Sequence, residues 1–176
     1  MSAILARAPG ARADDPGPLA GLVDTAAQRL QTADPVAASK GLTNGSIEDA
    51  TRAEQVIAAV TALAATAGVE PGYVRQVFAD QIAATEAVEY SRFAQWKLDP
   101  VAAPTAAPDL TVSRSAIDAL NRQMVDEIAA QWTVLRSPGC TRARDEAVTY
   151  VADARQLDAV YRQALGFATR SYCTGS

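Results

Sequence analysis

The chain contains no histidine among its 176 residues, and this absence excludes several kinds of catalytic site. Serine and cysteine nucleophiles commonly depend on an imidazole base, and the usual zinc and di-iron sites include histidine ligands. A glycosidase would need a pair of carboxylates, and no such pair stands out. Chemistry that relies on fixed charges and positioning remains, and we expect no metal site.

Aromatic residues and long apolar runs are also scarce. Aromatics make up 6% of the chain, and alanine dominates, with valine, arginine and leucine also common, which favours an all-helical protein. No apolar run approaches the ~20 residues that span a bilayer, so we expect a soluble protein without a membrane partner. The net charge of -4 argues against nucleic-acid binding. The length predicts one domain.

The N-terminal segment resembles the end of a signal peptide. Ala11-Arg12-Ala13 has the small-x-small pattern of a cleavage site, and Asp14-Asp15 follows it. The apolar stretch that should precede this pattern is almost missing, so a plain disordered tail is the alternative. We interpret residues 1–15 as the remnant of a signal peptide cleaved near Ala13. The folded domain is then 16–176, in a secreted or periplasmic protein.

Cys140 and Cys173 are the only cysteines. They predict one disulfide in a secreted protein, or two buried thiols in a cytosolic one, and the Ala-Arg-Ala pattern favours the disulfide. A straight helix between them would place the sulfurs roughly 50 Å apart, whereas a disulfide needs Cα atoms ~4.4–6.8 Å apart. An intramolecular bond therefore requires a helical hairpin, which we expect to break near Ala152-Asp153-Ala154.

Apolar residues at helical spacing begin near Pro18 and continue to Lys40. We expect a kink at Asp34-Pro35, because aspartate is a good N-cap and proline suits the first helical position. Gly41 is the predicted end of this helix. Ser46-Ile47-Glu48-Asp49 resembles a capping box that opens the second helix.

Three more helical regions follow in the sequence. Gly68 ends the second helix, and Glu70-Pro71 begins a third that runs to about Leu98. The proline-rich residues 99–108 form a linker. A fourth helix ends at Ser137-Pro138-Gly139, and the final region carries the predicted hairpin. The expected fold is an all-α bundle of five to six helices.

Charged side chains occupy the apolar faces of several predicted helices: Arg29, Lys40, Arg52, Glu89 and Arg114. Each alone is most simply a surface residue whose stem covers apolar neighbours. Together they place four cations against one carboxylate at positions that the helical period would bury. Burial of an unpaired charge is costly, so this excess predicts a ligand with negative charge.

The spacing of these residues resembles a known family. Lys40 follows Arg29 by eleven residues, and the order continues with Asp49-x-x-Arg52, Thr85-x-x-x-Glu89 and then Arg114. This pattern is similar to the all-helical AroQ class of chorismate mutases, and most of all to its secreted subclass, known from mycobacteria and other bacteria. The resemblance covers roughly residues 18–174. Its local strings are DPVAASK, IEDATR, DQIAATEAVEYSRFAQWKLDP and SRSAID.

The resemblance implies a reaction that uses no nucleophile, metal or cofactor. Chorismate, a dicarboxylate, rearranges to prephenate by a pericyclic [3,3] shift. The enzyme must hold the substrate in a compact geometry and stabilise the charge that develops on its ether oxygen. In the family pattern Arg29 and Arg114 bind the two carboxylates, Lys40 reaches the ether oxygen, and Glu89 must be protonated to donate to that oxygen.

The remaining roles also come from the resemblance. Thr85 offers its hydroxyl to a carboxylate, Arg52 helps to fix the substrate, and the backbone at Asp49 meets the ring hydroxyl. Glu86 completes the expected substrate-binding set. The subclass implies a homodimer with each active site built within one chain, and its cysteine pair fits the predicted disulfide.

Two departures and two alternatives accompany this hypothesis. Gly41 to Ser46 lack the bulky residues expected beside Lys40. Val56 stands where a polar residue should touch the ring hydroxyl, and neighbouring Gln55 need not point inward to replace that contact. Both changes would weaken substrate binding. The first alternative is a degenerate member that binds an anionic metabolite or a partner without catalysis. The second is a purely structural bundle with surface charges.

Overall fold

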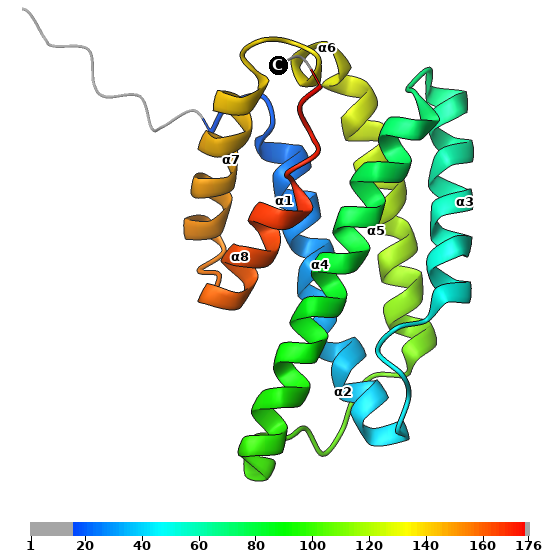
Figure 1. Ribbon diagram of the computed structural model, residues 1–176, viewed down its shortest axis with the longest axis vertical. Coiled ribbons are helices and arrows are strands. Elements are labelled where there is room, and N and C mark those ends of the chain that lie inside the picture. Colours follow the sequence, from blue (N-terminus) through cyan, green and yellow to red (C-terminus); the bar gives the residue numbers. More distant parts are fainter. Residues whose placement is uncertain (1–15, 175–176) are drawn as a thin grey trace, which may run out of the picture.

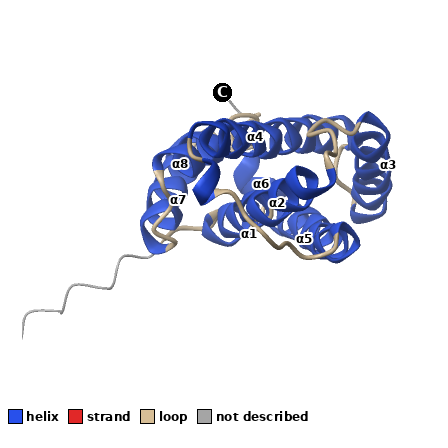
Figure 2. Cartoon of the chain, turned by 90° about the horizontal axis from the view of Figure 1, so that it is seen from below, coloured by secondary structure: helices blue, strands red, loops and turns tan. Residues whose placement is uncertain are grey.

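The computed structural model describes residues 16–174, and these residues form a helical bundle without strands. Figure 1 shows α1 in the middle of the bundle with α2 continuing below it, and Figures 1 and 2 show α3 on one side and α7 and α8 on the other. The elements are α1 (Ala20–Gln31), α2 (Ala33–Thr43), α3 (Ala50–Ala67), α4 (Pro71–Leu98), a 3₁₀ turn (Pro100–Ala102), α5 (Leu110–Ala130), α6 (Trp132–Leu135), α7 (Cys140–Ala154) and α8 (Ala159–Ala168). If α1 with α2 and α5 with α6 are each counted as one broken helix, residues 16–174 contain six α-helices, within the predicted range of five to six.

The break in the first helix was predicted at the wrong place. It lies at Thr32, whose backbone N–H donates to Arg29 O and Leu30 O, rather than at Asp34-Pro35. Pro35 is the third residue of α2, where no backbone donor is needed, because the first bond of that helix runs from Val36 N to Thr32 O. Proline therefore marks the first turn of α2 and not its first residue.

The predicted boundaries on either side of residue 45 also need correction. Gly41 lies within α2, and the helix ends instead at Asn44, which adopts the left-handed conformation with φ 54°. Asparagine tolerates this conformation better than most residues. Asp49, not Ser46, caps α3, and its Oδ1 accepts the backbone N–H of Arg52 at 2.9 Å. The helix start at Ala50 thus fixes the backbone beside Arg52.

The predicted third helix is confirmed as α4, which begins at Pro71 and ends at Leu98. It runs through the length of the molecule and contacts α1, α2, α3 and α8 (Figure 1). Gly68 ends α3 with φ 72°, as expected for a C-terminal glycine. The predicted fourth helix is divided at Gln131 into α5 and α6.

The C-terminal hairpin and the disulfide are confirmed. Cys140 and Cys173 are bonded, with Cα atoms 5.6 Å apart and a sequence separation of 33. The chain turns between Ala154 and Ala159, a few residues after the predicted position, and Gln156 takes φ 50° in this turn. Arg155 fastens the turn to α1, since its Nε donates to Asp24 Oδ1 at 2.5 Å.

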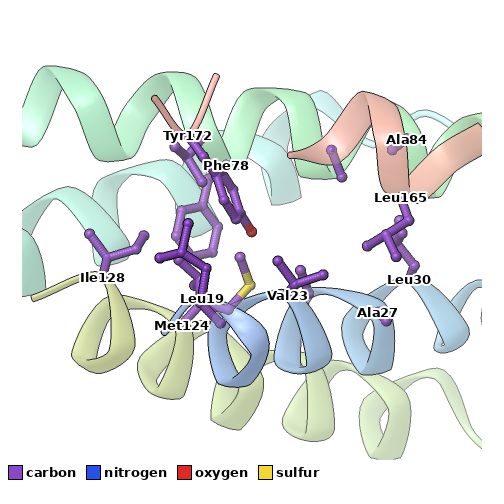
Figure 3. Packing of buried hydrophobic residues seen from close by; sticks show 14 of the residues in the cluster. Leu19, Val23, Ala27, Leu30, Phe78, Ala84, Met124, Ile128, Leu165 and Tyr172 are labelled. Carbon is purple, nitrogen blue, oxygen red and sulfur yellow. The ribbon is translucent and has the colours of Figure 1, made fainter. Parts of the chain in front are cut away.

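The core lies where α1 meets α4, α5 and α8 (Figure 3). Leu19, the residue before α1, is fully buried, as are Val23 and Leu30 of α1. Figure 3 shows Leu19 and Val23 near Phe78 of α4 and Met124 of α5, and Leu30 near Leu165 of α8. Such side chains stabilise the fold by about 1.5–3 kcal/mol each when taken from water. This packing fixes α1 against α4 and α5, the helices that carry most of the charged residues described below.

The proposed signal-peptide remnant, residues 1–15, lies outside the described residues. None of the helices within 16–174 combines the length and apolar character that a bilayer crossing requires.

Candidate active site

One pocket contains all eight residues predicted to bind a substrate. Its walls come from α1 to α5 and from the segment between α2 and α3. The predicted residues that line it are Arg29, Lys40, Asp49, Arg52, Thr85, Glu86, Glu89 and Arg114. Aliphatic side chains complete its surface: Val36, Ile47, Ala53, Val56, Ile82, Leu110 and Ile117. The pocket thus places a concentrated set of charges against apolar walls.

Lys40 and Glu89 form a buried ion pair in this pocket. Lys40 Nζ lies 2.8 Å from Glu89 Oε2, and the Glu89 side chain is 4% exposed. The same Nζ also donates to Ile47 O at 2.5 Å. Burial raises the pKa of Glu89, and the ammonium of Lys40 opposes this shift. Glu89 is therefore closer to protonation than an exposed glutamate, although it faces a cation.

Arg29 is the most buried cation of the site, with 3% of its surface exposed. Its partners are neutral: Nε donates to Asn121 Oδ1 at 2.6 Å, and Nη1 donates to Thr85 Oγ1 at 3.3 Å. The guanidinium also lies over the Phe78 ring, 5.9 Å from its centroid. Burial lowers the pKa of Arg29 to about 10, and the charge of Arg52 adds to this effect. Arg29 remains cationic at neutral pH without an adjacent carboxylate.

The other two cations do have carboxylate partners, which corrects the expectation of uncompensated charge. Arg52 Nη2 lies 2.6 Å from Asp118 Oδ1, and Arg114 Nη2 lies 2.7 Å from Asp49 Oδ2. The backbone N–H of Arg52 holds the pKa of Asp49 below its usual range, and Arg114 contributes. Asp49 therefore both caps α3 and binds Arg114.

Thr85 and Glu86 complete the polar surface on α4. Thr85 Oγ1 donates to Gln81 O at 2.8 Å while it accepts from Arg29, so its orientation is determined by both contacts. Burial raises the pKa of Glu86, and the charge of Glu48 adds to this shift. Gln81, one turn before Thr85 on α4, is fully buried, donates to Ala26 O and does not line the pocket.

The two departures from the family pattern have different outcomes. Val56 is 4% exposed and lines the pocket, whereas Gln55 lines a neighbouring groove between α3 and α5. The polar contact expected at this wall is thus replaced by an aliphatic one. Gly41 faces Trp96 on the other side of α2, and Ile47 forms the wall beside Lys40 instead.

The sequence profile described as chorismate mutase type II matches residues 20–90. The chain is 62% identical to the secreted chorismate mutase of Mycolicibacterium smegmatis over 165 residues, covering 94% of this chain and 91% of that protein. It belongs to the chorismate mutase family. The secreted chorismate mutase of Mycobacterium tuberculosis is 50% identical over 94% of this chain and 83% of its own length. The crystal structure of the Burkholderia phymatum chorismate mutase has a TM-score of 0.84 at 31% identity, covering 89% of this chain and 96% of that one.

Two site residues were missed from the sequence. Asp118 and Asn121 hold Arg52 and Arg29, and both come from α5. Their spacing from Arg114, four and seven residues, puts all three on one helix face, and this was the available signal. The signal is weak, because an aspartate or an asparagine on a helix is common on protein surfaces and does not by itself indicate a site.

Proposed function

We propose that this protein catalyses the [3,3] rearrangement of chorismate to prephenate in the pocket described above. The observation that carries the proposal is the convergence of Arg29, Lys40, Arg52 and Arg114 with Glu89 around one partly apolar pocket. This arrangement suits a dicarboxylate with an apolar ring, because guanidinium groups bind carboxylates through paired hydrogen bonds. The family relationship supports the same reaction.

In this proposal Arg29 and Arg114 bind the two substrate carboxylates. Arg29 contributes a buried guanidinium that Asn121 and Thr85 already orient. Arg114 is more exposed and must exchange Asp49 for the substrate. Thr85 and Arg52 add further donors, and the backbone at Asp49 meets the ring hydroxyl. Holding an extended dianion in one compact geometry lowers the barrier by removing the need to find that geometry.

Lys40 and Glu89 are proposed to act on the ether oxygen. That oxygen gains negative charge as its bond to carbon breaks, so a donor that is already in place stabilises the transition state. Lys40 is such a donor. Glu89 can donate only when protonated, and its burial favours that form. A bound dianion would raise its proton affinity further, because like charges disfavour ionisation.

A chorismate-consumption assay tests the proposal. We expect the purified protein to deplete chorismate and to form prephenate, followed by ultraviolet absorbance and chromatography. Arg29→Ala removes a carboxylate partner and should lower kcat/KM by at least about a hundredfold. Arg142→Ala, on an exposed side chain of α7, is the matched control and should leave the rate unchanged. A protein that binds chorismate without converting it would refute catalysis and leave a binding function.

We further propose that the protein is exported and works as a homodimer of single-domain chains. Export is supported by the relatives, which are named secreted, and by the disulfide, which persists in oxidising compartments. Lys40 and Arg114 line one pocket of one chain, so each protomer carries a full set of charges. Cell fractionation tests the location, and sedimentation equilibrium tests the dimer. A monomer with full activity would refute the dimer proposal alone.

A further inference from the structure

Helix α5 carries three polar residues on the face that it turns towards the pocket and the neighbouring groove. Arg114, Asp118 and Asn121 lie on one face of the helix, but only Arg114 lines the pocket. Asp118 and Asn121 line the neighbouring groove between α3 and α5, which shares Arg52 and Val56 with the pocket. Both residues therefore contact the guanidinium groups from the side away from the proposed substrate.

The contact between Asn121 and Arg29 fixes one edge of a buried guanidinium. Asn121 is 4% exposed, and its Oδ1 accepts the Arg29 Nε–H at 2.6 Å. Arginine offers donors only, so the side-chain oxygen of Asn121 must be the atom that faces it. With Nε engaged, the Nη donors remain for Thr85 and for a ligand in the pocket. Because Asn121 is neutral, it orients Arg29 without cancelling its charge.

The contact between Asp118 and Arg52 has a different electrostatic role. Arg52 lies close enough to Arg29 for its charge to lower the Arg29 pKa, and the charge of Asp118 opposes that effect. Asp118 also binds Arg52 directly, at 2.6 Å. It therefore reduces the repulsion between two neighbouring guanidiniums while it holds one of them.

We infer that Asn121 and Asp118 are positioning residues of this enzyme, which fix Arg29 and Arg52 from behind the pocket before the substrate arrives. The inference rests on the proposed function. The choice of residue at each position follows from burial: the deeply buried Arg29 has a neutral partner that preserves its charge for the substrate, and the more exposed Arg52 has a carboxylate partner. Neither residue touches the pocket, so each acts through its arginine.

The test of Asn121 is a double-mutant cycle with Arg29. Asn121→Leu keeps the approximate size of the side chain and removes the acceptor, and we expect kcat/KM to fall roughly 10–100-fold, as for the loss of a hydrogen bond to a charged group. Added to Arg29→Ala, the same change should cost less than about threefold, because its partner is already gone. Added to Arg114→Ala, it should retain its full effect.

Asp118 is tested by a conservative rescue. Asp118→Leu removes the partner of Arg52 and should lower kcat/KM roughly tenfold, whereas Asp118→Asn keeps an oxygen acceptor and should recover most of that loss. Gln55→Ala and Arg122→Ala are the controls: both residues line the same groove, and no hydrogen bond in residues 16–174 joins them to Arg29 or Arg52. Both should stay within twofold of the wild type.

The outcomes separate this inference from the proposed function. A wild-type protein that converts no chorismate overturns both. An active wild type with additive effects in the Arg29 cycle, or with folded Asn121→Leu within twofold of the wild type, overturns the role of Asn121 alone. If Asn121→Leu does not fold by circular dichroism, Asn121→Ser, whose hydroxyl is too short to reach Nε, replaces it with the same criteria. Equal losses in Asp118→Leu and Asp118→Asn overturn the hydrogen-bonding role of Asp118.

Discussion

Replacing Lys40 by methionine separates the catalytic and structural roles of the buried ion pair. The substitution keeps an apolar stem of similar length and removes the ammonium that contacts Glu89 Oε2 at 2.8 Å and Ile47 O at 2.5 Å. If Lys40 stabilises the ether oxygen in the transition state, kcat should fall by about 10²–10³, the loss measured when one oxyanion donor is removed. In this variant Glu89 stays buried but no longer has the ammonium group beside it.

The stability of Lys40→Met should depend on pH in a defined direction. Burial raises the pKa of Glu89, and Lys40 opposes that shift, so loss of Lys40 raises this pKa further. A carboxyl with a raised folded-state pKa keeps its proton in the folded state while the unfolded chain loses it. Stability therefore falls as pH rises from the ordinary glutamate value towards the folded pKa, by about 1.4 kcal/mol per unit. The loss is bounded by the ~3–5 kcal/mol that a broken buried pair costs.

Urea unfolding at several pH values, together with chorismate turnover, measures both effects. We expect Lys40→Met to approach wild-type stability near pH 5 and to lose the most near pH 8. Lys40→Met with Glu89→Gln removes the titrating group, so the pH dependence should disappear while activity stays low. A variant that is equally destabilised at both pH values would refute the linkage between Lys40 and Glu89. Wild-type kcat in Lys40→Met would refute the donor role.

Two further predictions concern Glu89 and the disulfide. If protonated Glu89 donates to the ether oxygen, kcat/KM should fall as pH rises through its pKa in the free enzyme, and Glu89→Gln should flatten that fall; an unchanged profile in the variant contradicts this role. Cys140→Ser with Cys173→Ser should lower the free energy of unfolding by ~3.7 kcal/mol, from the chain-entropy model applied to a separation of 33, measured by urea denaturation. Two free thiols in non-reducing mass spectrometry of the wild type would contradict the bond itself.

The helices could be predicted because their signals are local. Glu70-Pro71 and Gly68 act through their own backbone conformations, and both boundaries were confirmed. The break at Thr32 could not be predicted in this way, because it carries no strong local signal and no side-chain cap. Gly41 was misleading, because it lies within α2, where neither a helix end nor a close neighbour requires glycine: a Cβ there would meet Trp96 at 3.6 Å, an ordinary contact.

The site residues that could be predicted from the sequence are charged residues at positions where the helical period predicts burial. Arg29, Lys40 and Glu89 stand on faces that the helical period buries, and each is at most 9% exposed in the structure. Asp118 gives no such conflict, because its side chain is 42% exposed and looks like any surface aspartate. Its importance depends on which arginine a different helix brings beside it, and that is tertiary information.

The ion pairs found in place of free cations make the site easier to use, not harder. The pair that the substrate must exchange, Arg114 with Asp49, has side chains 38% and 39% exposed. Pairs this exposed are worth about 0–1 kcal/mol, because water and side-chain entropy offset the attraction. A substrate carboxylate with two hydrogen bonds can displace such a partner at little cost. The pair that would be expensive to break, Lys40 with Glu89, can remain in contact if the glutamate takes a proton. The site can thus keep its cations ordered without substrate and still allow Arg114 to leave Asp49 and bind a carboxylate of the dianion that enters.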